Sequence, residues 1–158
     1  MRKSVMFILV LTVCIFAETV FFDDFESGTG NWTLTGNWGI ESGAGLTGTN
    51  CLTESPAGDY TAENSSTAEL TDNFDLRTYD YGSVEFWRKF DIEEDFDYMF
   101  FQISDDNGSN WDIIETWTGT DSVWTKETYS LYKYIGHGQV KFRFVFLSSE
   151  TGGFSSFC

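Results

Sequence analysis

The side chains of this sequence that could do chemistry are mainly carboxylates, grouped in three short segments at residues 23–26, 93–97 and 104–111. Two carboxyl groups can share acid–base work when burial raises the pKa of one of them. Several carboxylate oxygens can also hold a calcium ion, which takes about six to eight oxygen ligands. Catalytic, metal-binding and purely structural roles therefore have to be weighed among these segments.

The densest group is Glu93-Glu94-Asp95, with Asp97 close behind it. These residues crowd into a polar turn between two expected strands, without an apolar stretch that would bury one of them. Charge runs of this kind usually remain in water. We therefore expect a solvated, cation-attracting loop. The alternative is a fragment of a glycosidase that uses Glu93, Glu94 and Asp97.

Residues 104–111 fit the Asp-box pattern Ser-x-Asp-x-Gly-x-x-Trp, with Ser104, Asp106, Gly108 and Trp111 at its fixed positions. Asp106 can accept hydrogen bonds from loop amides, and Gly108 can take a positive φ. Trp111 then begins the returning strand and can pack across the hairpin. Local bonds between side chains and backbone suffice to explain such a hairpin, so we expect a structural role. Presentation of a ligand site is the alternative.

The usual catalytic motifs are missing from the sequence. His137 is its only histidine and lies between two glycines, a poor scaffold for the rigidly held base of a Ser-His-Asp triad. The sequence has no Gly-x-Ser-x-Gly elbow, phosphate-binding loop or His-Glu-x-x-His motif. We therefore expect a non-catalytic protein.

Alternating apolar and polar residues predict the strands that would position these side chains. The clearest case is Val140, Phe142, Phe144 and Phe146, which have polar or basic neighbours along most of the run. A content of 18% aromatic residues also favours strands. The expected strands are residues 19–25, 83–92, 98–104, 111–117, 123–131 and 139–148. In the second of them Arg88 interrupts the apolar face.

Turn residues separate these strands at 105–108, 118–121 and 136–138, where Gly, Asn and Asp gather. The sequence keeps no sustained apolar period of 3.6, so we expect no long helix. We predict an all-β fold, an antiparallel β-sandwich of the jelly-roll kind. Residues 27–73 are rich in Gly, Ser, Thr and Asn, and we expect loops and short edge strands there.

The N-terminus has the order of a secretory signal peptide. Two basic residues precede an apolar run from Val5 to Phe16, and Ala17 offers a small residue for cleavage. The run is too short for a transmembrane helix, which needs about 20 residues. We expect a signal peptide at residues 1–17, a single domain at residues 18–158 and a secreted or cell-surface location. A buried N-terminal strand and a lipoprotein signal are the alternatives.

Charge and cysteines limit the partners and the compartment. The chain has 25 acidic and 9 basic residues and a formal net charge of -16. Such a surface repels nucleic acid and anionic membranes, so we expect neither as a partner. Cys51 and Cys158 remain after the signal peptide and can pair in an oxidising compartment, but two cysteines alone establish no contact.

A series of motifs runs through the predicted domain in a recognisable order. They are Phe21-Phe22-Asp23-Asp24-Phe25-Glu26-Ser27, Trp32, Trp38-Gly39-Ile40, Phe74-Asp75-Leu76-Arg77, Val84-Glu85-Phe86-Trp87-Arg88, the Asp-box hairpin and Lys141-Phe142-Arg143-Phe144. Their order resembles the MAM-like jelly-roll domains attached to secreted metallopeptidases of the immune inhibitor A type. It also resembles the cleaved-adhesin domains of bacterial surface proteins.

The resemblance implies a non-catalytic extracellular module that binds glycans or proteins, or that supports an attached peptidase domain. It also implies a structural calcium ion, for which Asp24 and Glu26 would supply ligands from one face of the first strand. A solvated acidic strand end is the alternative. Such domains close with an acidic strand that does not follow Gly152-Gly153-Phe154 here. We therefore expect a jelly roll that is incomplete at its C-terminus and lacks its last strand.

Tryptophans are the remaining indication of a binding surface. Trp87, Trp117 and Trp124 lie in expected strands, where exposed rings could stack on sugars or anchor a protein partner. Such residues more often complete a core, and we expect that here. A purely structural spacer without a ligand is the remaining alternative for the whole domain.

Overall fold

The computed structural model describes residues 18–150 and residue 158, so the predicted signal peptide lies outside the described residues. The strands and the single short 3-10 helix of this part are β1 (Trp32–Leu34), β2 (Gly39–Ser42), β3 (Asn50–Thr53), β4 (Ser65–Leu70), β5 (Ser83–Asp91), β6 (Tyr98–Ser104), β7 (Asp112–Trp117), β8 (Thr120–Ser130), η1 (Tyr132–Tyr134) and β9 (Lys141–Leu147). In this part of the chain, none of the helical structure is long and apolar enough to cross a membrane.

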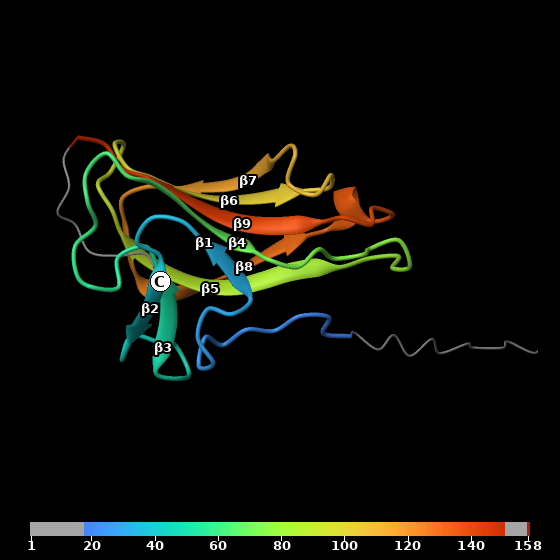
Figure 1. Ribbon diagram of the computed structural model, residues 1–158, viewed down its shortest axis with the longest axis horizontal. Helices are drawn as coiled ribbons and strands as arrows, with labels where there is room; N and C mark the ends of the chain where they lie inside the picture. Colours follow the sequence, from blue (N-terminus) through green and yellow to red (C-terminus); the bar gives the residue numbers. More distant parts are fainter. Residues whose placement is uncertain (1–17, 151–157) are drawn as a thin grey trace, which may run out of the picture.

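The strands form a sandwich of antiparallel sheets, which confirms the predicted fold class. One sheet has five strands in the order β1-β4-β9-β6-β7, while β5 pairs with β8 and β2 pairs with β3. Figure 1 shows β6, β7 and β9 in one layer, β5 in the layer beneath it, and the β2–β3 hairpin at one end. That the jelly roll lacks its last strand stays a prediction.

The core lies between the two layers because the apolar residues of each strand face inward at alternate positions. Phe142 and Phe146 of β9 are buried, and Phe144 packs against the same cluster. The Phe86 ring of β5 lies 5.0 Å from the Phe101 ring of β6 and 5.1 Å from the Phe144 ring, measured between centroids. Fully burying one such ring contributes about 2–3 kcal/mol to folding.

The prediction of a strand at residues 19–25 is wrong, since no strand is assigned within the described residues before β1. Asp23 explains the difference. Its carboxylate accepts hydrogen bonds from Phe25 N at 2.9 Å, Asn31 Nδ2 at 3.1 Å and Trp32 Nε1 at 3.0 Å. Because the side chain satisfies nearby donors, the segment folds as a turn and not as part of a ladder.

Arg88 lies on the inward face of β5, where the sequence places it as an interruption of the apolar residues. It is 8% exposed and forms ion pairs with Asp121 and with Glu127, the latter at 2.7 Å. Its guanidinium also lies 4.9 Å from the Phe90 ring centroid and 5.5 Å from that of Trp117. The core therefore accommodates one buried cation that β8 neutralises.

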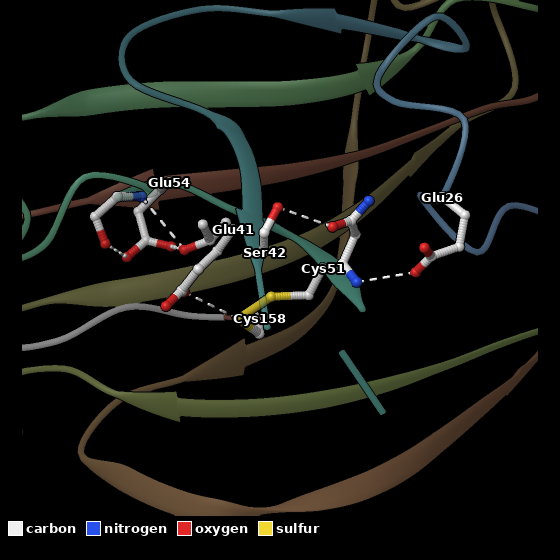
Figure 2. Close-up of a disulfide and its surroundings, with 9 residues drawn as sticks. Glu26, Glu41, Ser42, Cys51, Glu54 and Cys158 are labelled. Carbon is white, nitrogen blue, oxygen red and sulfur yellow. Dashed lines mark hydrogen bonds between the residues drawn. A yellow bond between two sulfur atoms is a disulfide. The ribbon is translucent and has the colours of Figure 1, made fainter. Parts of the chain in front are cut away.

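A disulfide joins Cys51 of β3 to Cys158, with the two Cα atoms 5.7 Å apart, which settles the pairing that the sequence left open (Figure 2). Cys158 also exchanges two backbone hydrogen bonds of 3.0 Å with Lys89 of β5. Glu41 of β2 lies beside the bridge, with Oε2 3.7 Å from Cys158 Sγ. These contacts attach the β2–β3 hairpin to the layer that contains β5.

Candidate binding face on the five-stranded sheet

The five-stranded sheet turns one face to the core and the other away from it, and we call the second one the outer face. In β9 the side chains of Phe142 and Phe144 point inward, so those of Arg143 and Val145 between and beyond them point outward. Directly paired residues share a face. The register then assigns to the outer face Thr67 and Glu69 of β4, Tyr98, Phe100 and Gln102 of β6, Ile113 and Thr116 of β7, and Lys141 and Leu147 of β9.

Arg143 occupies the middle of this face, directly between Glu69 and Gln102 in the register. Its Nε donates a hydrogen bond of 2.7 Å to Gln102 Oε1. Its guanidinium carbon lies 4.0 Å from the centroid of the Trp111 ring, within the range of a cation–π contact. Partial burial lowers the pKa of Arg143, while the charge of Glu69 acts in the opposite direction.

Aromatic and aliphatic side chains lie next to this guanidinium. The rings of Tyr98 and Phe100 stack with centroids 6.1 Å apart and an angle of 27° between their planes. Both are partly exposed, and Ile113 and Leu147 on the same face are 59% and 38% exposed. The outer face therefore combines flat apolar surface with hydrogen-bonding groups.

The Asp-box hairpin connects β6 to β7 and is closed by its own bonds. Ser104 Oγ donates to Asp106 Oδ1 at 2.8 Å and accepts from Gly108 N at 2.9 Å. Asp106 also accepts from Asn110 N at 2.8 Å and Asn110 Nδ2 at 2.6 Å. The bonds from Asn110, together with the one from Ser104, hold the pKa of Asp106 at about 2.

The same hairpin places Trp111 against the outer face. Trp111 Nε1 donates to Gly108 O at 3.0 Å, and Gly108 has a φ of 83°. A Cβ at this glycine would lie 3.3 Å from the Trp111 ring, a tight contact. The hairpin is thus self-bonded and also supplies the ring on which Arg143 rests. The structural role and the ligand-site role considered for residues 104–111 are therefore compatible.

Asp24 and Glu26, the predicted calcium ligands, lie far along the chain from this hairpin, in the turn before β1. Both Glu26 oxygens accept hydrogen bonds, from Thr49 N at 2.7 Å, Asn50 N at 2.9 Å and Thr49 Oγ1 at 2.8 Å. These bonds, led by the one from the Thr49 side chain, lower the pKa of Glu26. Figure 2 shows Glu26 directed at the β2–β3 hairpin. A calcium ion would have to compete with these donors, so the calcium site stays a prediction.

The expectation that residues 93–97 form a solvated loop is right for Glu94 and Asp95, which are exposed, and wrong for Asp97. Asp97 is fully buried, accepts a short hydrogen bond from Tyr60 Oη and accepts another from Ser149 N at 2.7 Å. Burial, helped by this carboxylate, raises the pKa of Tyr60. Asp97 therefore fastens two loops to the end of β9.

The three carboxylates of the glycosidase alternative do not converge. A shallow polar cleft is lined by residues 91–94 and 118–120, which includes Glu93 and Glu94 but not Asp97. Asp97 is instead enclosed with Tyr60. This arrangement gives no support to a carboxylate pair that works across one bond.

The predicted core role of the tryptophans holds for Trp117, which is 7% exposed, and is wrong for Trp87, which is 47% exposed. Trp124 is half-buried, with the Lys89 ammonium 5.1 Å from its ring centroid. Trp87 and Trp124 belong to β5 and β8, and so to the layer opposite the outer face.

Sequence reasoning missed Phe100, Gln102 and Arg143 as members of a common site. Their alternation with core residues was visible, but each strand by itself shows only polar and aromatic residues between core positions. The site arises from the pairing of β6 with β9, two strands that are distant in sequence. Only a correct prediction of the strand order could have identified this site from the sequence.

Comparison with known proteins supports the fold. The sequence matches no family model and no curated protein. The structure is similar to the K1 cleaved adhesin domain of Lys-gingipain from Porphyromonas gingivalis W83, with a TM-score of 0.60, 14% identity and coverage of 85% of this chain and 92% of that one. It is also similar to TmCBM61 in complex with β-1,4-galactotriose, with a TM-score of 0.54, 18% identity and coverage of 85% and 91%. A third similar structure is the C-terminal family 22 carbohydrate-binding module of Clostridium thermocellum Xyn10B, with a TM-score of 0.55, 17% identity and coverage of 87% of this chain and 88% of that one. The predicted resemblance to cleaved-adhesin domains is therefore confirmed at the level of the fold.

Proposed function

We propose that this protein is a non-catalytic, extracellular binding module that holds a glycan on its outer face. The observation that carries the proposal is the stacked, partly exposed pair Tyr98 and Phe100 beside the hydrogen-bonding groups of Gln102 and Arg143. Sugar sites combine flat apolar surface with a few fixed polar groups. The fold shared with carbohydrate-binding modules and adhesin domains supports the same function.

Export is part of this proposal. The N-terminal pattern of charge, short apolar run and small residue is that of a signal peptide. The disulfide between Cys51 and Cys158 suits an oxidising compartment. In a longer protein the module would serve a catalytic domain, such as the peptidase that the MAM-like resemblance implies.

Protein adhesion is the second candidate, and one observation favours it. Trp87 and Val123, in the layer opposite the outer face, are 47% and 67% exposed. Large exposed apolar side chains are common anchors of protein interfaces. A protein partner would then bind through β5 and β8 and not through the five-stranded sheet.

A glycan array tests the proposal, with the wild-type protein compared with Phe100→Ala and with Trp87→Ala as the matched aromatic variant on the opposite layer. We expect binding to at least one glycan, which Phe100→Ala weakens by about tenfold through lost stacking while Trp87→Ala does not. Absence of binding to every glycan, or equal losses in the two variants, would contradict the proposal.

The calcium proposal has its own test. If calcium binds at Asp24 and Glu26, saturating CaCl2 raises the thermal midpoint of the wild-type protein, because a ligand that binds only the folded state stabilises it. Glu26→Gln should abolish this shift. An equal midpoint with CaCl2 and with a chelator would remove calcium from the proposal.

A further inference from the structure

Arg143 is a cation that no carboxylate of the described chain pairs with. The other basic residues between 18 and 150 form ion pairs with carboxylates, with the exception of Lys89, which rests on Trp124. Glu69 is opposite Arg143 in the register, but its carboxylate pairs with Lys141. In a protein with a formal net charge of -16, an arginine left without an acidic partner calls for a reason.

The guanidinium of Arg143 is held by two neighbouring side chains through its Nε and its flat surface. Gln102, itself only 9% exposed, accepts from Nε at 2.7 Å, and the Trp111 ring supports the guanidinium plane from 4.0 Å. The two terminal nitrogens have no hydrogen-bond partner among the described residues and are not enclosed. An arginine fixed in this way presents parallel N–H donors that match the two oxygens of a carboxylate.

The stacked rings of Tyr98 and Phe100 lie close enough to Arg143 to contact the remainder of a ligand whose carboxylate is bound there. Phe100 pairs with Val145, and Arg143 is two residues further along β9, so Phe100 and Arg143 are diagonal neighbours. Diagonal positions in an antiparallel sheet are about 7–8 Å apart, a span that one sugar ring can bridge. We propose that the outer face selects a glycan that carries uronic acid, with its carboxylate on Arg143 and its pyranose ring against Phe100 and Tyr98.

This inference rests on the proposed function and adds to it the chemical class of the ligand. Two observations support it besides the geometry. Partial burial lowers the pKa of Arg143, so the charge is poorly solvated and gains from an anionic partner. At about 0.15 M salt, exposed charges more than about 8 Å from the site are largely screened, so the overall acidity of the protein does little to oppose an anion bound there. Recognition of a uronate must therefore be local, at Arg143.

The test compares ligands that differ only in the carboxylate, at about 0.15 M salt. Polygalacturonate, alginate and hyaluronan are measured by isothermal titration, each against its methyl-esterified or carboxyl-reduced form. We expect at least one acidic polymer to bind about tenfold or more tightly than its neutral form, since a charge-assisted bidentate contact is lost. Equal affinity for both forms overturns the carboxylate assignment and leaves the proposed function intact. If none of the polymers binds and the glycan array is also empty, the proposed function fails as well.

Variants assign the effect to the residue. Arg143→Gln should remove the preference for the acidic form, and Arg143→Lys should weaken it, because an ammonium lacks the planar fork. Lys89→Gln, the matched change at the other cation without a carboxylate partner, should keep the wild-type preference. Thermal midpoints identify any variant that fails to fold, and the ligand pairs on the wild-type protein need no variant. Poly-glutamate binding as tightly as the best uronate would overturn the assignment to a sugar.

Discussion

Replacing Cys51 and Cys158 together by serine removes the disulfide that spans 107 residues of sequence. The replacement acts mainly on the unfolded chain, which gains conformational entropy once the loop is no longer closed. For a loop of this length the chain-entropy relation gives about 4.8 kcal/mol at 25 °C. With an unfolding entropy of about 2.1 cal/mol/K per residue, a domain of this size should lose roughly 15 °C in its thermal midpoint.

The assay is thermal unfolding followed by circular dichroism at pH 7, for the wild-type protein and the double serine variant, each with and without reductant. Reductant should lower the wild-type midpoint to that of the variant and leave the variant unchanged. A wild-type midpoint within about 3 °C of the variant's would refute the reasoning, since it would mean that the bridge does not restrict the unfolded state. A variant as sensitive to reductant as the wild type would refute it too.

Other substitutions test the hairpin and the buried cation. Gly108→Ala should destabilise the protein by about 1–2 kcal/mol because residue 108 has a positive φ. The loss should exceed that of Gly136→Ala, since Gly136 has a similar φ of 88° but open space where a Cβ would lie. Equal thermal midpoints for the two variants would contradict the contact with Trp111. The folded-state pKa of Asp106, about 2, is below the unfolded value of about 3.9, so its contribution is present above pH 4 and is lost as the pH falls towards 2. Asp106→Asn should therefore reduce the dependence of the thermal midpoint on pH between pH 4 and pH 2, and a dependence equal to that of the wild-type protein would contradict this. Arg88→Met should lower the free energy of unfolding, measured in urea, by about 3 kcal/mol, because two carboxylates lose their partner. A loss below about 1 kcal/mol would show that the two ion pairs of Arg88 are dispensable.

Alternation of side chains was sufficient to predict β5, β6 and β9, because their inward positions carry Phe, Val, Met and Ile with few exceptions. The same reasoning failed at residues 19–25, where the carboxylate of Asp23 competes for backbone donors. It placed Arg88 on the inward face but could not give its partners in β8, which lie 33 and 39 residues further along the chain. Periodicity reports which face a residue occupies and not which charges meet it there.

The candidate site depended on information of another kind. The Asp-box hairpin is local, and its bonds between Ser104, Asp106 and Asn110 span only a few residues. The contact of Trp111 with Arg143 joins residues of β9 and of the β6–β7 connection, and it exists only because β9 lies beside β6. Since strand order is a property of the whole sheet, the sequence alone indicated the parts of the outer face without their assembly.

The bridge between Cys51 and Cys158 also determines how the protein responds to mechanical tension. When a pull acts between residues 18 and 158, force passes from Cys158 through the covalent bridge directly to Cys51. Only the residues before Cys51 can then be drawn out, to a contour of about 115 Å at about 3.5 Å per residue, against about 490 Å after reduction. The outer face lies almost entirely within the bypassed loop, so a ligand bound there would keep its site while the tether bears load.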